Sequence, residues 1–213
     1  MKRTILTTAA LAVISTGAFA EEKSCCHDKA KHSDTYVRMD VLGQKFHKSS
    51  VNGTTYKNQN YSYGADFGLG YHLTDKIRAE LIYNHNFITR FKNKTSKGKA
   101  DIKAVFLRTM FDVISFEKAK FFVGAGAGFA RTAYKLNTPT ANYSAKNKNN
   151  FAYSFHAGAA MDIVEGVMLE ASWGMRNYGS TQALTDRKSA AKLDSSKMKL
   201  RAQMVSLGLR FDV

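Results

Sequence analysis

Three residues in this sequence have types and spacings that could carry out acyl transfer. Ser154 and His156 lie two positions apart, and Glu170 falls on the next predicted strand. A serine, a histidine and a carboxylate can act as nucleophile, base and orienting acid. The alternative is a polar network inside the protein, and nothing in the sequence supplies hydrogen-bond donors for an oxyanion. We therefore expect no catalytic residues and no enzymatic activity.

A second group that could do chemistry is Cys25-Cys26-His27, with His32 nearby. Cysteine and histidine bind metals, and adjacent thiols can also take part in redox chemistry. The spacing does not match the usual zinc-binding patterns, so the alternative is a solvated tail whose thiols oxidise or pair between chains. We expect no metal site and no cofactor, and the role of Cys25-Cys26 stays open.

The N-terminus has the layout of an export signal. Lys2 and Arg3 give it a positive start, an apolar stretch runs from Ile5 to Ile14, and Ala18-Phe19-Ala20 fits a cleavage site. The apolar stretch is too short for a helix that spans a bilayer. We expect a signal peptide at 1–20, a flexible periplasmic segment at 21–33, and a single domain at 34–213.

The elements that must position these groups are β-strands, because apolar side chains recur with a period of two after Ser33. In residues 61–73, for example, Tyr, Ala, Phe and Leu alternate with Ser, Gly, Asp and His. One proline, fifteen glycines, fourteen Phe and ten Tyr residues also favour strands. The pattern predicts eight strands, at about 35–46, 61–73, 77–90, 104–114, 121–130, 150–163, 167–176 and 203–213.

The connections between these strands alternate in length. Short turns follow the second, fourth and sixth strands, and long connections occupy about 47–59, 91–101, 135–149 and 179–197. Short turns at one rim and long loops at the other are typical of bacterial outer-membrane barrels. We therefore predict an all-β, eight-stranded, antiparallel up-and-down transmembrane barrel with short periplasmic turns and long extracellular loops. Its apolar outer face would contact outer-membrane lipid.

The inner face of this barrel would hold charges of both signs. Buried charges must pair, and an eight-stranded barrel is just wide enough for its own side chains. We therefore predict a plugged, salt-bridged interior and not a general diffusion pore. The predicted interior charge network consists of Arg38, Asp40, Asp66, Arg78, Glu80, Arg108, Asp112, Asp162, Glu170 and Arg176, with Arg210 and Asp212 near the periplasmic rim.

Positive charge gathers in the predicted extracellular loops of this chain, whose formal net charge is +15. A basic rim could bind sulfated glycans or acidic patches of host surface or serum proteins, and no nucleic acid is expected there. The alternative is that the charges provide solubility and contact with anionic lipid headgroups. The candidate ligand-binding residues are Lys92, Lys94, Lys97, Lys99, Lys146, Lys148, Arg187 and Lys188.

Several motifs carry a family resemblance: Phe122 to Gly128, Asn150 to Tyr153, Glu170 to Trp173 with Arg176 to Gly179, and Gly208 to Asp212. They resemble the opacity-type, OmpA-like outer-membrane barrels, and most closely the rickettsial surface adhesins of that family. The resemblance implies an eight-stranded barrel whose exposed loops bind host surface or serum proteins. Phe211 resembles the terminal aromatic signal that the barrel-assembly machinery recognises.

A non-enzymatic adhesin is therefore the leading hypothesis from the sequence. The runner-up is a structural envelope barrel or narrow channel without a specific ligand. A lipid-modifying acyl hydrolase that uses Ser154, His156 and Glu170 comes third.

Overall fold

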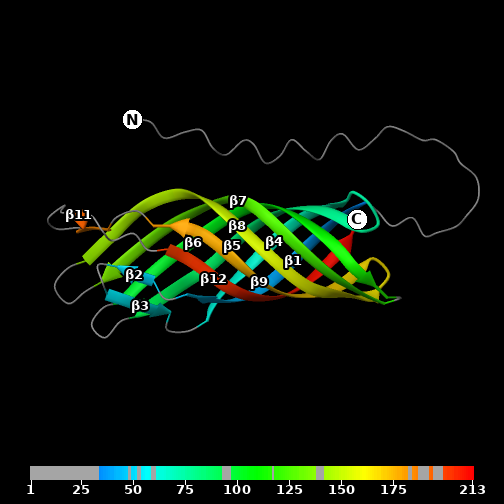
Figure 1. Cartoon of the computed structure of the whole chain (residues 1–213), viewed down its shortest axis with the longest axis horizontal. Helices are drawn as coiled ribbons and strands as arrows, with labels where there is room; N and C mark the ends of the chain where they lie inside the picture. Colours follow the sequence, from blue (N-terminus) through cyan, green and yellow to red (C-terminus); the bar gives the residue numbers. More distant parts are fainter. Residues whose placement is uncertain are drawn as a thin grey trace, which may run out of the picture. The chain divides into compact units, whose positions relative to one another are not determined.

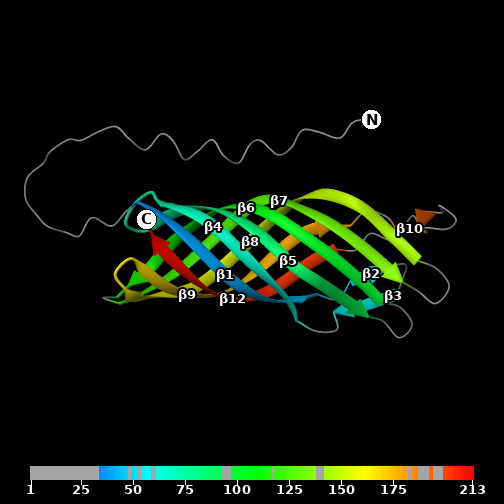
Figure 2. The ribbon, with the colours of Figure 1, turned by 180° about the vertical axis from the view of Figure 1, so that it is seen from behind.

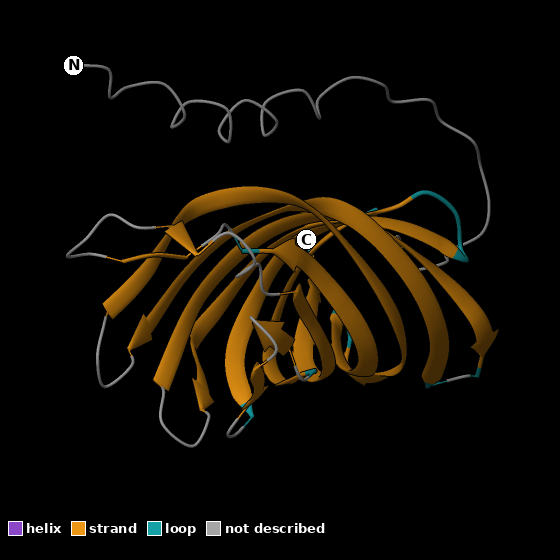
Figure 3. Cartoon of the chain, turned by 60° about the vertical axis from the view of Figure 1, so that its left-hand side comes forward, coloured by secondary structure: helices purple, strands orange, loops and turns teal. Residues whose placement is uncertain are grey.

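The computed structural model describes residues 34–47, 49–51, 54–58, 61–92, 97–116, 118–137, 142–181, 184–186, 192–193 and 199–213. The expected signal peptide, the segment at 21–33 and a part of each predicted long loop lie outside these ranges. Every regular element in the described residues is a β-strand (Figure 3). No helix in these ranges has the length and apolar character needed to cross a membrane.

Eight long strands form a closed barrel: β1 (Thr35–Phe46), β4 (Ser62–His72), β5 (Ile77–Lys92), β6 (Lys97–Ser115), β7 (Ala119–Asn137), β8 (Asn142–Val164), β9 (Val167–Ser180) and β12 (Lys199–Asp212). Each strand is antiparallel to its neighbours, in the order β1-β4-β5-β6-β7-β8-β9-β12 (Figure 1 and Figure 2). The ring closes where β12 pairs with β1. Closure removes the free edges of the sheet. The predicted fold is confirmed.

The two ends of the barrel differ. At the turn end, residues 73–76, 116–118 and 165–166 join β4 to β5, β6 to β7 and β8 to β9. Glu165-Gly166 makes a tight hairpin in which Gly166 has a φ of 74°, a conformation that suits glycine. The loop end holds the other four connections. The short strands β2 (Ser49–Val51), β3 (Thr54–Asn58), β10 (Leu184–Asp186) and β11 (Lys192–Leu193) also lie there.

Two of the predicted long loops are in fact largely strand. β5 ends at Lys92 and β6 begins at Lys97, while β7 ends at Asn137 and β8 begins at Asn142. The predicted loops at 91–101 and 135–149 were therefore wrong, and residues 93–96 and 138–141 alone connect these strands. The strands could not be recognised because their outward side chains change from apolar to charged, although their pairing continues.

These longer strands form a raised wall at the loop end, made of residues 88–92, 97–103, 131–137 and 142–150. A strand needs about 9–11 residues to cross a bilayer. β6, β7 and β8 have 19, 19 and 23 residues, and their ends extend away from the turn end (Figure 1). The raised wall therefore carries its side chains beyond the membrane.

The outer face of the barrel is apolar and the inner face is closely packed. Leu107, Phe129 and Val205 are 64%, 69% and 62% exposed, as expected of side chains that contact lipid. The inner face requires glycine where large side chains cross the lumen: a Cβ atom on Gly70 would overlap the ring of Tyr36. The small inward residues of β4 therefore make room for side chains from β1.

Candidate functional site

The turn-end part of the barrel interior is filled by ion pairs that centre on Glu170 of β9. Its carboxylate lies 2.6 Å from Arg78 Nη1, 2.9 Å from Arg38 Nη1 and 3.0 Å from Arg210 Nη1. Arg38 Nη1 also lies 2.9 Å from Glu80 Oε1. These five buried side chains come from β1, β5, β9 and β12, so the ion pairs connect strands on different sides of the ring.

A second part of the same network lies nearer the loop end. Arg108 Nη2 of β6 is 2.8 Å from Glu80 Oε2, and Arg176 of β9 makes a two-pronged contact with Asp66 of β4. Asn84 Nδ2 also donates to Asp66, at 2.6 Å. Because each buried carboxylate meets a cation, the charges offset one another's cost of burial.

The structure buries almost all of the predicted interior residues, namely Arg38, Asp40, Asp66, Arg78, Glu80, Arg108, Asp112, Glu170 and Arg176, together with Arg210. Two predicted members differ: Asp162 is exposed, and Asp212 is half-buried. Our assignment of Asp162 to the buried interior was wrong: it pairs with the inward-facing Met168, but it lies at the turn end, where the lumen opens. Asp162 instead lines an open mouth of about 600 Å³ with Lys120 and Asp212.

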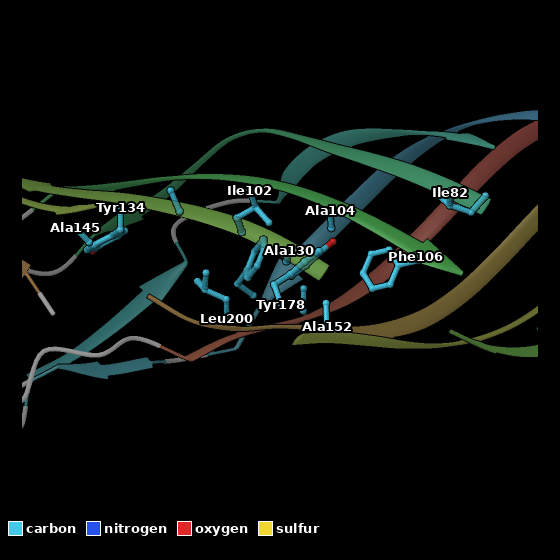
Figure 4. Packing of buried hydrophobic residues seen from close by; sticks show 13 residues of the cluster. Ile82, Ile102, Ala104, Phe106, Ala130, Tyr134, Ala145, Ala152, Tyr178 and Leu200 are labelled. Carbon is cyan, nitrogen blue, oxygen red and sulfur yellow. The ribbon is translucent and has the colours of Figure 1, made fainter. Parts of the chain in front are cut away.

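An apolar layer closes the interior toward the loop end, and the sequence did not reveal it. Phe106, Tyr178 and Leu200 are almost fully buried in one cluster with Ile102 and Tyr134 (Figure 4). The Tyr178 hydroxyl donates to Gln44 Oε1 at 3.1 Å, which joins this layer to the polar network. The alternation contained a signal for the layer, since Phe106 and Leu200 lie on the inward phase of their strands.

The three residues considered for acyl transfer do not form a catalytic triad. Glu170 binds three arginines, and it pairs across the sheet with Ala160, four residues along β8 from His156. Within the described residues, neither the His156 ring nitrogens nor Ser154 Oγ has a hydrogen-bond partner. A triad needs a nucleophile bonded to its base and a base oriented by its acid. The described geometry therefore offers no hydrolase site of this kind.

The predicted basic ligand-binding residues differ in their surroundings. Lys99 lies on β6 and is exposed, whereas Lys148 lies on β8, is half-buried and donates to Ser180 Oγ at 3.4 Å. Our placing of Lys92, Lys97, Lys99, Lys146 and Lys148 in loops was wrong, because all five belong to β5, β6 or β8. The side chains of Lys92, Lys97 and Lys146, and the whole of Lys94, Arg187 and Lys188, lie outside the described residues.

The raised wall carries a row of cations on its outward face. Arg90 of β5 is directly opposite Lys99 of β6, which is directly opposite Lys135 of β7. All three side chains are exposed. We call these three residues the basic row. Of these residues only Lys99 was among the predicted candidates, since Lys135 and Arg90 were not recognised as outward strand residues.

Comparison with known proteins shows which family and which relatives this chain resembles. Residues 6–211 match the family described as outer membrane protein beta-barrel domain. The chain is 26% identical over 203 residues to a Rickettsia conorii protein named "Putative adhesin RC1281", which covers 84% of this chain and 82% of the relative. A Rickettsia prowazekii protein of similar name is 26% identical over the full length of both chains. The crystal structure of Neisserial surface protein A aligns with a TM-score of 0.56 at 15% identity, over 85% of this chain and 98% of that one.

Proposed function

This chain belongs to the outer membrane β-barrel family, and we propose that it is an adhesin that binds anionic host ligands through outward cations at its loop end. The protein is an outer-membrane barrel, so its outer apolar face contacts lipid. The proposal rests on the basic row, in which Arg90, Lys99 and Lys135 lie directly opposite one another on three strands.

The basic row is unfavourable for the fold itself. Neighbouring strands lie about 4.8 Å apart, and like charges directly opposite one another destabilise a sheet. Neutral polar side chains would build the same strands without this repulsion. An anionic ligand that lies across β5, β6 and β7 would offset the repulsion among the three cations and form an attractive contact with each of them. Binding such a ligand would explain why three cations lie side by side here.

The ligand chemistry that fits the row is a repeated or clustered negative charge. A sulfated glycan carries one anionic group after another, and an acidic patch on a host surface or serum protein offers a similar pattern. The adhesin names of the rickettsial relatives are consistent with a surface-binding role. We place the binding face outside the cell, and we expect export by the N-terminal signal and insertion by the barrel-assembly machinery.

A structural barrel without a ligand is the second candidate. The buried ion pairs around Glu170 and the apolar layer around Tyr178 favour it over a channel, because together they occupy the lumen. We propose no enzymatic activity. In a purely structural barrel the basic row would have no effect on attachment, so the two candidates differ in a measurable way.

The test is attachment of a non-adherent bacterium that displays the barrel to cultured host cells. The variant carries Arg90→Gln, Lys99→Gln and Lys135→Gln, and the matched control carries Lys76→Gln, Lys118→Gln and Lys120→Gln at the turn end. We expect the first variant to lose most attachment and the control to retain it, at equal surface amounts. Attachment by the first variant at the wild-type level would contradict the proposal. Heparinase treatment of the host cells then distinguishes glycan from protein ligands.

A further inference from the structure

A groove crosses β8, β9 and β12 on the outer face of the barrel, and neither the family nor the proposed adhesin role accounts for it. It has a volume of about 510 Å³, and its lining includes Tyr153, Phe155, Met175, Asn177, Lys199 and Arg201. A second hollow of about 260 Å³ shares Asn177, Lys199 and Arg201 with it. The two hollows therefore lie side by side on the barrel surface.

An irregularity in strand pairing lies at one end of the groove. Arg201 pairs with Asn177 and Lys199 pairs with Ser180, so β9 has one more residue than β12 in this interval. Gly179, within the extra length, has a φ of 81°, a conformation that favours glycine. A bulge of this kind bends its strand and re-aims nearby side chains. The irregularity therefore sets how the backbone runs at the basic end of the groove.

The floor of the groove is apolar and its upper rim is basic. Tyr153, Phe155 and Met175 are 39%, 55% and 45% exposed and lie on the outward face. Arg201 and Lys199 are also exposed, on the neighbouring strand. Tyr153 is held in place in the floor, because its hydroxyl accepts a hydrogen bond from Asn177 Nδ2 at 3.0 Å. An apolar floor below two cations matches an amphiphile with an acyl chain and an anionic headgroup.

The position along β12 places these cations at the membrane border. Leu209, Leu207 and Val205 face outward along the strand, followed by Gln203 and then Arg201. Trp173 pairs with Val205 and so lies just below the groove, and Trp is enriched at membrane interfaces. The cations therefore lie at headgroup level, where a lipid phosphate would be found.

We propose that this groove binds a phosphate-bearing lipid of the outer leaflet, with an acyl chain along Tyr153, Phe155 and Met175 and the phosphate at Arg201 and Lys199. A guanidinium fork matches the oxygens of a phosphate in a two-pronged contact. The apolar floor gives no benefit to a free phosphate ion, so the occupant is a lipid. This site is separate from the basic row, which lies on β5, β6 and β7.

Trp173 is the one tryptophan of the chain and serves as the reporter. The barrel is placed in phosphatidylcholine nanodiscs that contain a small share of either nitroxide-labelled phosphatidic acid or phosphatidylcholine labelled at the same acyl carbon. Phosphatidic acid acts as the probe for a phosphate headgroup. We expect several-fold stronger quenching of Trp173 by labelled phosphatidic acid. Unlabelled phosphatidic acid should reverse the quenching, and inorganic phosphate should not.

Matched variants locate the effect in the groove. Arg201→Gln with Lys199→Gln should abolish the preference for phosphatidic acid, whereas Lys103→Gln with Arg131→Gln, which removes equal charge from the outward face of β6 and β7, should retain it. Heat-dependent gel mobility confirms that each variant is folded. Equal quenching by both lipids in the wild type, equal loss in both variants, or full competition by inorganic phosphate would each overturn the proposal. None of these outcomes depends on host-cell attachment, so failure here leaves the adhesin proposal standing.

Discussion

The paired strands β5 and β6 place unlike charges opposite each other on the inner face of the barrel and like charges opposite each other on the outer face. On the inner face, Glu80 lies opposite Arg108 and forms an ion pair at 2.8 Å; on the outer face, Arg90 lies opposite Lys99. The same backbone pairing thus supports an attractive contact in one place and a repulsive one in another. The inner charges are explained by the fold, because burial requires them to pair. Burial does not explain the outer charges, and the anionic ligand that we propose would supply their partner.

The largest expected effect comes from breaking the inner arrangement at its centre. Glu170→Gln leaves Arg38, Arg78 and Arg210 facing a neutral amide. Removing one partner of a buried ion pair costs about 3–5 kcal/mol, so we expect a loss of this order in the free energy of unfolding. Urea unfolding of the refolded barrel in lipid vesicles measures it. Asp162→Asn, an exposed control, should change it little, and equal effects of the two variants would refute the structural role of the network.

A smaller change in the free energy of unfolding is expected when one methyl group is added to the inner or the outer face of the barrel sheet. In Gly128→Ala the new Cβ would meet the backbone carbonyl of Val105, whereas in Gly43→Ala it would meet nothing within 4 Å. Overpacking costs about 1–3 kcal/mol, so we expect Gly128→Ala to destabilise the barrel by about this amount. Gly43→Ala should be nearly neutral in the same unfolding assay. The reverse order would show that the inner face is less closely packed than described.

The smallest effect on stability is expected from the outer face. Lys99→Gln removes the central charge of the basic row, and relief of like-charge repulsion is worth about 0.2–1 kcal/mol. We expect the free energy of unfolding to stay unchanged or rise slightly, and the difference from wild type to shrink at high salt. Marked destabilisation by Lys99→Gln would mean that Lys99 supports the fold, and the contrast between the two faces would fail.

The sequence predicts the fold well because each membrane-crossing strand alternates in side-chain type. The same alternation places Arg38, Glu80 and Glu170 on the inner face, where the structure has them. It also places Phe106 and Tyr178 on the inner face, but the apolar layer was not recognised, because these residue types also suit the lipid face. The alternation fails in the raised wall, where outward residues such as Lys99 and Lys135 are polar and the strands look like loops.

Other parts of the candidate sites depend on register, which the sequence does not contain. Lys148 looked like any other loop lysine, yet its strand turns it toward Ser180. The basic row exists only because Arg90, Lys99 and Lys135 are brought opposite one another by pairing between distant segments. The groove likewise forms only because Tyr153, Met175 and Arg201 are brought side by side on three paired strands. Each of these follows from how two strands align and not from either strand alone.

The most direct test of the division between the two faces is the binding of heparin by the purified, refolded barrel in neutral nanodiscs over a range of salt concentrations. We predict that wild-type affinity falls as salt rises. Replacing Arg90, Lys99 and Lys135 together by Gln should weaken binding about tenfold or more, or about 1.4 kcal/mol, while the variant stays as stable as the wild type. The turn-end control with Lys76, Lys118 and Lys120 replaced by Gln should bind like the wild type. Equal affinity and equal salt dependence in all three proteins would contradict the account.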